Sequence, residues 1–559
     1  MGFREGVEGV GGLKGVTCAW IGFVSVLFFV GSLVLVNPAR VYVSPDETAN
    51  AFFATRFAES LWMRGPVDVL LESFDPTSLD GGELRGTSRL HPRSTLVLDG
   101  QIVPGSFLGL PFLYGFFVMI LGPMALWYLT PLLTILAAYG WRRIVQRYTN
   151  LSIANIAFTL FLLHPAVWYY SARGLMHNVL FLDLLVLAAW LWVIRPMGGK
   201  VERWKGGKVE RSVWNDLLAG LFIGLALFVR TSEFLWIGVG LAFAGLIWWC
   251  TLSWRRLRAG LFGLLAGLGL FFLMNYVTYG HPLTTGYTLG ATPLVEMDAT
   301  SSIDQVALLP FGFHPMNAWR HFSAYAVTMF WWLSILALPG FFLLLAQKAN
   351  RRTIRWAITL ATVVSLWLVF MYGSWEIHDN PDPTQITMAN SYVRYWLPMY
   401  LFSTPMIAVA IAWIASRGRS YLARGLIVAT LLLAVIGLNV NAVFVQGQDG
   451  LVKMREELLN SAQIQASVLR YTEENAVIIV DRGDKLFFPH RHVWYPLRDD
   501  ATYDAMPTLA QATTLYYYGI TFPEKDFGYL NDSRLKRMNL GIELIETYGD
   551  ESLYRIITP

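Results

Sequence analysis

The sequence predicts an α-helical polytopic membrane protein that ends in a small α/β domain. Of its 559 residues, 55% are hydrophobic and only 15% are charged, and the mean hydropathy is +0.45. This composition is too apolar for an ordinary soluble domain. Apolar runs close to the roughly 20 residues needed to cross a bilayer recur along the chain. After residue 445 the composition becomes charged and mixed, which predicts a domain outside the bilayer.

The first apolar run, residues 16–36, is expected to be a span that the mature protein keeps. No small-residue cleavage pattern follows this run, so it does not resemble a signal peptide. Cys18 and Cys250 both lie in apolar runs, a placement that predicts neither a disulfide framework nor a thiolate metal cluster.

Basic clusters between the apolar runs predict the orientation of the spans. They are Arg142, Arg143 and Arg147; Lys200, Arg203, Lys205, Lys208 and Arg211; Arg255, Arg256 and Arg258; Lys348, Arg351, Arg352 and Arg355; and Arg417, Arg419 and Arg424. The positive-inside rule places these loops in the cytoplasm. The spans between them then pair as 151–168 with 176–194, 212–229 with 234–250, 258–274 with 325–346, and 356–373 with 395–415. A last span over 425–445 leaves residues 446–559 outside.

The front of the chain allows two topologies, because two apolar stretches, 104–122 and 124–140, precede the first basic cluster. If both cross, the loop that starts near residue 37 is cytoplasmic; if one crosses, it is external. The first stretch contains Pro104, Pro111 and several glycines, which is typical of a re-entrant or interfacial segment. We therefore expect about 11 spans, with the N-terminus inside and residues 37–123 forming a first external loop with interfacial helices.

The segment SPDETANAFFATRFAES, residues 44–60, carries two adjacent carboxylates at a predicted helix start. Ser44 followed by Pro45 and by Glu47 three residues on is a capping-box pattern. Phe53, Phe57 and Leu61 recur at helical spacing, which predicts a half-buried helix. Asp46 and Glu47 could both serve only to start this helix, since acidic side chains there favour the helix dipole. Alternatively, Glu47 is the cap and Asp46 is available for chemistry.

Further polar residues lie at the predicted external ends of the spans. Arg230 and Glu233 are one helical turn apart and could either neutralise each other or serve a function at membrane depth. Arg394 could extend to the interface, or could bind a lipid phosphate through its forked donors. Aromatic residues such as Tyr395 could form an interfacial belt or stack on sugar rings. The histidines are scattered, without the close spacing of a zinc motif.

Four segments resemble the GT-C superfamily of integral-membrane glycosyltransferases, in the branch of the protein O-mannosyltransferases and the lipid A aminoarabinose transferase. They are SPDETANAFFATRFAES, LALFVRTSEFLWIG, NYVTYGHPLTTGY and SYVRYWLPMY. The resemblance covers residues 17–415, and the carboxylate pair in the first external loop is its most specific feature. It implies a GT-C fold and transfer of a sugar from a polyprenyl-phosphate donor to an acceptor on the extracytoplasmic face.

The resemblance also implies roles for individual residues. Asp46 would be the catalytic carboxylate, the general base that deprotonates the acceptor in an inverting, in-line displacement of phosphate. Arg394 would stabilise the departing lipid phosphate, with Arg230 a weaker candidate. His281 and Tyr287, in the GHPLTTGY loop, would line the substrate pocket. The full set expected to bind substrate is Glu47, Arg230, Glu233, His281, Tyr287, Arg394, Tyr395, His177 and Asn178.

The chain departs from the family pattern in the short loop SARGLMHN. Several relatives place a second acidic residue there, whereas this chain offers His177 and Asn178. Asp183 would lie inside the following span and is a poor substitute. The second polar partner is thus unassigned, no cofactor is implied, and a divalent cation stays an open alternative.

The tail is expected to be a separate extracytoplasmic α/β domain over residues 446–559, following a transmembrane domain over residues 1–445. A helix over MREELLNSAQIQASVLRYTEE precedes AVIIVD, LFFP, TLYYYGI, GIELIETY and LYRIIT, which are expected to form short strands with helices between them. No Gly-rich phosphate loop follows AVIIVD, so nucleotide binding is not indicated.

The function that the sequence favours is therefore glycosyl transfer by a multi-pass protein of the plasma membrane. Its expected partners are a polyprenyl-phosphate sugar donor, the lipid bilayer, and a glycan, lipid or protein acceptor, with no nucleic acid. A transporter or flippase of lipid-linked glycans is one rival, although no internal repeat is evident. A polysaccharide polymerase or ligase is a second rival.

Overall fold

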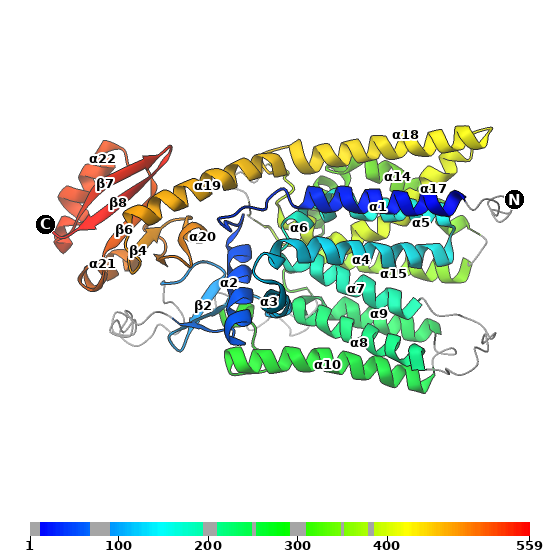
Figure 1. The fold of residues 1–559 in the computed structure, drawn as a ribbon, viewed down its shortest axis with the longest axis horizontal. Helices are drawn as coiled ribbons and strands as arrows, with labels where there is room; N and C mark the ends of the chain where they lie inside the picture. Colours follow the sequence, from blue (N-terminus) through cyan, green and yellow to red (C-terminus); the bar gives the residue numbers. More distant parts are fainter. Residues whose placement is uncertain are drawn as a thin grey trace. The chain divides into compact units, whose positions relative to one another are not determined.

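A computed structural model describes residues 12–66, 90–193, 210–248, 253–290, 309–347, 351–377, 379 and 385–559 of the chain (Figure 1). The chain divides into two compact units. The first contains residues 1–35, 127–271 and 295–453, and the second contains residues 36–126, 272–294 and 454–559. Parts of the predicted loops around residues 67–89, 194–209 and 291–308 lie outside the described residues, and so do Cys250 and Lys348.

The first unit is helical throughout its described residues. Its helices are α1 (Gly12–Ser32), α4 (Ala125–Tyr148), α5 (Leu151–Leu162), α6 (Pro165–Ala172), α7 (His177–Val193), α8 (Glu210–Val229), α9 (Phe234–Trp248), α10 (Trp254–Tyr279), α13 (Pro315–Phe322), α14 (Trp331–Ala346), α15 (Arg351–Gly373), α16 (Ser391–Tyr395), α17 (Leu397–Ala415) and α18 (Tyr421–Val440). The apolar stretches that were predicted to cross the membrane fall on these helices, but two of them are broken: 151–168 runs across the break between α5 and α6, and 325–346 begins before the break that precedes α14.

Several of these helices are long and apolar enough to cross a bilayer. Four pass by themselves: α10, α15, α17 and α18 extended to Val445. Four further pairs of consecutive helices pass only when taken together, which gives up to 8 spans if each bent pair is one span. One such pair, α8 with α9, bends by 117° at its break. The helical, membrane-spanning class is thus confirmed, while the number of spans expected from the sequence stays a prediction.

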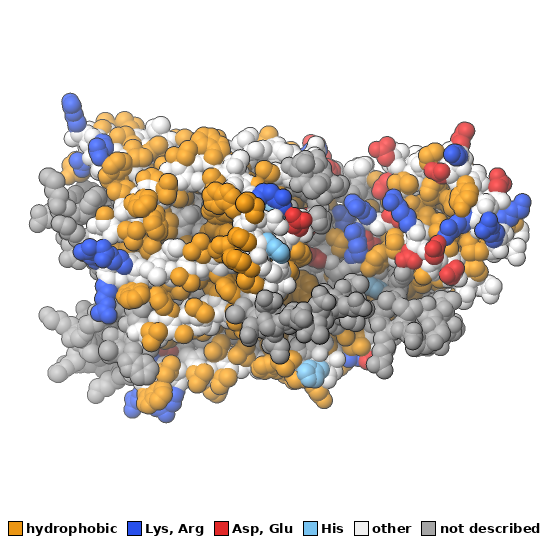
Figure 2. All heavy atoms as spheres, turned by 180° about the vertical axis from the view of Figure 1, so that it is seen from behind, with side chains coloured by type: hydrophobic (Ala, Val, Ile, Leu, Met, Phe, Trp, Pro, Cys, Tyr) orange, Lys and Arg blue, Asp and Glu red, His pale blue; other side chains and the backbone are white. Residues whose placement is uncertain are grey.

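The surface of the helical unit has the pattern of a protein in a bilayer. Large apolar side chains are exposed along α14, where Ile335, Leu338 and Phe342 are each at least 60% exposed. Figure 2 shows hydrophobic side chains over the helices and lysine and arginine side chains gathered at one end of them. Apolar surface on this scale is stable only against lipid or a partner.

Helices α8 and α10 approach each other closely through glycines. A Cβ atom added to Gly224 would lie 2.7 Å from the Leu264 carbonyl oxygen, and one added to Gly267 would lie 2.7 Å from Gly224 Cα. The rings of Phe228 and Phe271 meet beside this contact, 6.2 Å apart. Small residues at a helix interface permit such backbone contact, which replaces the hydrophobic driving force that lipid does not supply.

The second unit begins with α2 (Pro45–Ser60) and a three-stranded sheet. The strands are β1 (Gly65–Pro66), β2 (Thr95–Leu98) and β3 (Gln101–Pro104), in the order β1-β3-β2 with antiparallel pairs. Helix α3 (Gly109–Leu121) follows and packs against α2, with the rings of Phe57 and Phe112 5.0 Å apart. Phe53 and Phe57 are buried as expected, but Leu61 is exposed because it ends α2 in a left-handed conformation.

The C-terminal part of this unit is a helix followed by a mixed sheet. Helix α19 (Leu451–Tyr471) precedes β4 (Val477–Val480), α20 (Asp484–Phe487), β5 (His492–Trp494), α21 (Asp500–Ala512), β6 (Leu515–Ile520), α22 (Glu524–Tyr529), β7 (Gly541–Tyr548) and β8 (Glu551–Ile557). The order is β5-β4-β6-β8-β7, with β4 parallel to β5 and β6 and the other pairs antiparallel.

The predicted helix and four of the five predicted strands of the tail are confirmed, and one predicted strand is wrong. The run LFFP was expected to be a strand, and its first residues instead end helix α20, while β5 was missed. A short apolar run has no periodicity that separates a strand from a buried helical turn. The sheet packs in one core with Leu90, from the segment before β2. The domain boundary predicted at residues 445/446 stays a prediction. The compact unit that contains most of the tail also contains residues 36–126.

The glycine contact predicts a clear contrast within α10. Gly267→Ala should lower the melting temperature of the protein in detergent, because overpacking at a close backbone contact costs about 1–3 kcal/mol. Gly269→Ala, on the same helix with nothing within 4 Å of the added Cβ, should be neutral or slightly stabilising. Equal melting temperatures for the two variants would contradict the close packing of α8 on α10.

Candidate active site

The start of α2 is built as the sequence predicted. The Ser44 hydroxyl accepts a hydrogen bond from the Glu47 backbone N–H, and Glu47 Oε2 accepts from the Ser44 backbone N–H at 2.9 Å and from its hydroxyl at 2.9 Å. Glu47 is 3% exposed. The capping box is therefore present, and the Glu47 carboxylate is occupied by the helix start.

Asp46, next to the cap, contacts a different part of the second unit. Its Oδ1 accepts a hydrogen bond of 2.5 Å from the Ser94 hydroxyl. Ser94 has a φ of 64°, a left-handed conformation that costs a residue with a Cβ roughly 1–2 kcal/mol. The Ser94 carbonyl accepts from the Gly105 N–H at 3.0 Å, which closes the β2–β3 hairpin behind it. The surrounding structure thus holds Ser94 in a costly conformation that directs its hydroxyl to Asp46.

The residue before Ser94 is anchored to the C-terminal segment. Asp484, whose side chain is 1% exposed, accepts three hydrogen bonds from Arg93: from the backbone N–H at 2.8 Å, from Nε at 3.0 Å and from Nη2 at 2.6 Å. Nη2 also donates to the Arg482 carbonyl at 2.9 Å. Several hydrogen bonds from one guanidinium to a buried carboxylate stabilise the pair and also fix the relative position of the two residues. The anchor therefore determines where Ser94, one residue on, is held.

The loop after α10 reaches the same hairpin. The Tyr279 hydroxyl donates to the Pro104 carbonyl at 2.7 Å, and the Gly286 N–H donates to the Ser106 carbonyl at 3.3 Å. A Cβ on Gly286 would collide with the backbone of Gly105 and Ser106, so only glycine fits this contact. The segment after α10 therefore contacts the backbone of residues 104–106, which follows the hairpin that holds Ser94.

The two residues predicted to bind substrate from this loop differ in their surroundings. The Tyr287 ring, 53% exposed, lies 4.8 Å from that of Phe107. His281 is exposed, and its Nδ1 accepts from the Leu283 N–H at 3.3 Å, within its own turn. Tyr287 therefore offers an aromatic face, whereas the hydrogen bond of His281 lies within its own turn.

In the first unit, Arg230 and Glu233 neutralise each other, which is one of the two alternatives that the sequence left open for this pair. Arg230 Nη2 lies 2.7 Å from Glu233 Oε1, and both side chains are buried. Tyr372 joins them: its hydroxyl accepts from Arg230 Nη2 at 2.9 Å and donates to Glu233 at 2.5 Å. Trp236 Nε1 donates to Glu233 Oε2 at 2.6 Å. The carboxylate is fully engaged, which is what a charge buried at this depth requires.

Tyr395 links this pair to Arg394. The Arg230 guanidinium lies 5.0 Å from the Tyr395 ring centroid and the Arg394 guanidinium lies 5.4 Å from it, within the range of cation–π attraction. Arg394 Nη2 also donates to the Ser391 hydroxyl at 2.7 Å. The structure therefore brings Arg394 and the Arg230–Glu233 pair together at the Tyr395 ring.

The short loop SARGLMHN lies beside this cluster. Asn178 Nδ2 donates to the Arg394 carbonyl at 3.2 Å, and His177, 8% exposed, is the first residue of α7. The two guanidinium groups of this cluster are groups that can bind an anion such as a phosphate. A second carboxylate lies close by, because Asp379 Oδ2 accepts from the Ser391 N–H at 2.7 Å.

Asp183 does not join either group. It is buried within α7 and its Oδ2 accepts from the Thr134 hydroxyl at 2.7 Å. Its place in an apolar helix agrees with the expectation that it is a poor substitute for a second acid. Within the described part of the chain, no group of three or more histidine, cysteine, aspartate or glutamate side chains is placed to hold a metal ion.

Sequence reasoning missed Ser94, Arg93 and Asp484 as parts of the Asp46 environment. The pair Arg93 and Asp484 is separated by 391 residues, so no local spacing signals it. Tyr372 was also missed, 139 residues from Glu233. The available signals were an arginine beside a serine in a polar loop, and a tyrosine at the end of an apolar run, both common features.

Solved structures with a similar fold exist, although sequence comparisons find none. No protein-family model matches the chain, and no curated protein sequence does. The structure of ArnT from Cupriavidus metallidurans in the apo state matches 98% of this chain and 98% of its own, with a TM-score of 0.55 and 12% identity. ArnT of the same organism bound to undecaprenyl phosphate matches with a TM-score of 0.54, 11% identity and coverage of 97% and 98%.

A third similar structure scores lower. The archaeal oligosaccharyltransferase AglB from Archaeoglobus fulgidus, in complex with an inhibitory peptide and a dolichol-phosphate, covers 93% of this chain and 71% of its own. Its TM-score is 0.48 at 11% identity, and no argument below depends on it. The two ArnT matches show that this chain has a fold similar to that of ArnT over nearly its whole length, in agreement with the fold that the resemblance implied.

The Arg93–Asp484 anchor predicts asymmetric effects of mutation on stability. Arg93→Ala should cost about 3 kcal/mol, because it leaves a buried carboxylate without its partner. Asp484→Ala should cost less, since the Arg93 side chain is 36% exposed and can be solvated. The melting temperatures of the purified variants in one detergent give the comparison. A larger loss for Asp484→Ala than for Arg93→Ala would contradict this account.

Proposed function

We propose, from the premise that this chain has the fold of ArnT over nearly its whole length, that it transfers a sugar from a polyprenyl-phosphate donor to an acceptor. The observation that carries the proposal is the arrangement of the two adjacent carboxylates. Glu47 caps α2, while Asp46 accepts a hydrogen bond from the Ser94 hydroxyl. Separate roles for neighbouring acids suit a site in which one of them does chemistry.

Asp46 acts as the general base in this proposal. Its carboxylate accepts the proton of the attacking hydroxyl or amine as that atom forms a bond to the anomeric carbon and the bond from that carbon to the phosphate oxygen breaks. A single in-line displacement inverts the anomeric configuration. Ser94 is a positioning residue: its hydrogen bond selects the rotamer of Asp46.

Arg394 and Arg230 carry the leaving phosphate. The departing phosphate gains negative charge in the transition state, and guanidinium groups stabilise that charge through forked hydrogen bonds. The shared contact of both arginines with Tyr395 supports this assignment, because it holds two cations at a defined separation. Arg394 is the candidate that the family resemblance favours, and Arg230 forms an ion pair with Glu233.

The remaining predicted residues have supporting roles. Tyr287 and Tyr395 offer rings on which a sugar can stack. His281 lies on the loop that carries Tyr287, and His177 and Asn178 begin α7, where Asn178 donates to the Arg394 carbonyl. The acceptor is a glycan, a lipid or a protein. Direct displacement needs no metal ion, and a divalent cation is the alternative to arginine for holding the phosphate.

The proposed setting is the plasma membrane, with about 11 spans and the active face outside the cytoplasm. The basic residues gathered at one end of the helical unit support a cytoplasmic location for that end (Figure 2). Residues 446–559 are then an extracytoplasmic domain. A transporter or flippase, and a polymerase or ligase, are the rival functions, and neither explains why Asp46 and Glu47 are separately held.

The assignment of the base predicts that Asp46→Asn lowers the transfer rate at least about 100-fold, the usual contribution of a positioned base. The melting temperature should hardly change, because the asparagine Oδ1 still accepts from Ser94. The measurement is release of polyprenyl phosphate from a polyprenyl-phosphate sugar by purified protein, together with thermal unfolding.

Glu47→Gln is the matched control for that variant. It removes the same charge one residue along, and glutamine still completes a capping box, so turnover should stay near the wild-type rate with a slightly lower melting temperature. Equal loss of turnover in well-folded forms of both variants would contradict the division of roles.

The proposed topology predicts the labelling of Asp99, whose side chain is 73% exposed. In a variant without Cys18 and Cys250, a cysteine introduced as Asp99→Cys should react with a membrane-impermeant thiol reagent in intact cells. Arg419→Cys, in a predicted cytoplasmic loop, should react only after lysis. The opposite pattern would place the Asp46 loop in the cytoplasm and remove the basis for an extracytoplasmic active face.

A further inference from the structure

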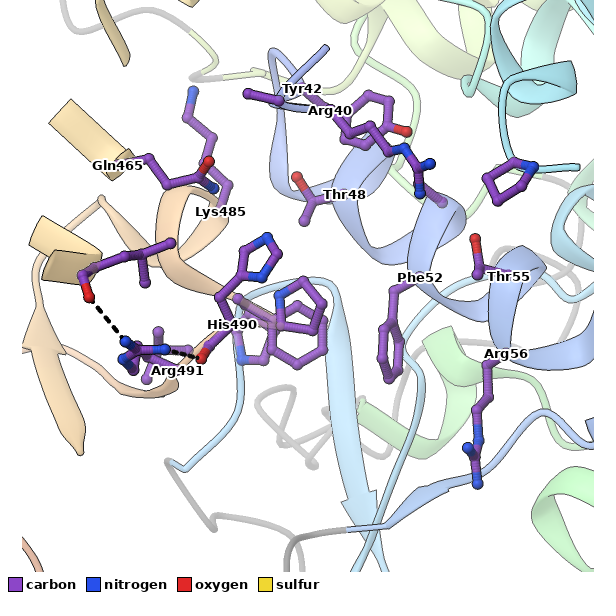
Figure 3. A pocket seen from close by; sticks show the side chains of 18 of the residues that line it. Arg40, Tyr42, Thr48, Phe52, Thr55, Arg56, Gln465, Lys485, His490 and Arg491 are labelled. Carbon is purple, nitrogen blue, oxygen red and sulfur yellow. Dashed lines mark hydrogen bonds between the residues drawn. The ribbon is translucent and has the colours of Figure 1, made fainter. Parts of the chain in front are cut away.

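The second unit contains a pocket of about 800 Å³ that none of the roles above uses. Its walls come from the segment before α2, one face of α2, residues 90–92, helix α19 and residues 485–493 (Figure 3). All of these segments belong to the same unit. A volume of this size suits a small organic ligand rather than a single ion.

The pocket lies on a different face of α2 from Asp46. Thr48, Phe52, Thr55 and Glu59 line it at helical spacing, and they form one stripe of α2. At about 100° per residue, Asp46 lies on roughly the opposite side of the helix. A ligand in this pocket is therefore separated from the proposed base by the helix itself.

The lining is strongly basic. Arg40, Arg56, Lys485 and Arg491 line the pocket, and among the described residues that line it Glu59 supplies the one carboxylate. Three histidines, His91, His490 and His492, add to this lining. The Thr55 hydroxyl also lines the pocket and can donate, whereas the Thr48 hydroxyl donates to the Ser44 carbonyl at 3.2 Å (Figure 3). Arginine, lysine and hydroxyl donors around one cavity are the groups that bind phosphate oxygens.

Two of the cations have structural bonds that hold them in place. Arg491 donates to the carbonyls of Leu469 and Thr472 at 3.0 and 2.8 Å, which satisfies the C-terminal end of α19. Lys485 Nζ donates to the Val43 carbonyl at 2.6 Å. These contacts fix the positions of two positively charged side chains on the wall of the pocket.

Arg40 differs from the other cations. It is exposed, and its guanidinium makes no hydrogen bond or ion pair with another described residue. Its φ is 53°, in the left-handed region, where glycine is cheaper than arginine. Buried Asn37 imposes this conformation: its amide group binds the Val41 N–H at 3.0 Å and the Val41 carbonyl at 2.9 Å. Strain of this kind persists mainly where the side chain has a function.

The apolar lining limits the ligand further. Phe52 and Phe488, whose ring centroids are 4.7 Å apart, form a hydrophobic wall next to the cations. We propose that this pocket binds a phosphate ester, with Arg40 and Lys485 on the phosphate and the Phe52–Phe488 wall on the organic group. The ester comes either from a lipid headgroup or from a soluble phosphorylated compound, and the site is separate from that of the sugar donor.

A site-specific protection experiment tests this on the full-length protein in neutral detergent. Ala466→Cys, in a variant without Cys18 and Cys250, places one thiol on the exposed, pocket-lining side of α19. Glycerol 1-phosphate should slow its reaction with N-ethylmaleimide saturably. Protein in nanodiscs with phosphatidic acid should be protected relative to nanodiscs of phosphatidylcholine alone if the ester is a lipid. Protection in either arm supports the proposal and identifies the source; protection in neither overturns it.

Variants that remove a positive or a negative charge from the pocket test whether electrostatic binding of the ligand causes the protection. Arg40→Gly should raise the ligand concentration for half-protection about tenfold, the effect of one charge-assisted hydrogen bond, while keeping or raising the melting temperature because the left-handed strain is relieved. Glu59→Gln should lower that concentration. Arg537→Ala, an exposed arginine outside the pocket, is the matched control and should change nothing. Equal protection of wild type and Arg40→Gly would overturn the proposal.

The same assay with Asp46→Asn separates this site from the proposed chemistry. Half-protection should occur at the wild-type concentration, because Asp46 lies on the other side of α2. A large change in that concentration would show that the two faces form one site and would overturn the separation. The outcome does not depend on whether the protein transfers sugar, so the two proposals fail independently.

Discussion

The ion pair between Arg93 and the buried Asp484 is the contact on which the environment of Asp46 depends. It joins residues 391 positions apart, and it fixes the segment that presents the Ser94 hydroxyl. Without it, the left-handed conformation of Ser94 would have little to hold it against its steric cost. The β2–β3 hairpin and the glycine contact of Gly286 complete this support from the other side. A carboxylate intended for proton transfer needs such support, because an error of about 1 Å in its position is costly.

The same arrangement explains why the C-terminal segment belongs with the first loop rather than forming an isolated appendage. Leu90 is part of the hydrophobic core of the C-terminal sheet, and Phe488 packs against Phe52 of α2. Lys485, next to Asp484, binds the backbone just before the capping box. The tail is therefore a structural component of the second unit, and the basic pocket is one product of its contact with α2.

Local features of this structure were predictable from the sequence, and distant ones were not. The capping box, the buried stripe of Phe53 and Phe57, and the pairing of Arg230 with Glu233 follow from spacings of three or four residues. The sheet in the tail followed from runs of β-branched and aromatic residues, except for LFFP, where four apolar residues fit a helical turn as well as a strand. The partners Asp484 and Tyr372 depend on how distant segments fold together, which no local pattern in a single sequence reveals.

The central claim is that this protein breaks the bond between a sugar and a polyprenyl phosphate by direct attack of an acceptor. The most direct measurement follows a polyprenyl-phosphate sugar of known anomeric configuration, incubated with the purified protein and a cell-envelope extract as the source of acceptor. The account predicts equal amounts of polyprenyl phosphate and glycosylated product, with the anomeric configuration inverted. Transport of the intact lipid-linked sugar without its cleavage, or a product of retained configuration, would contradict it.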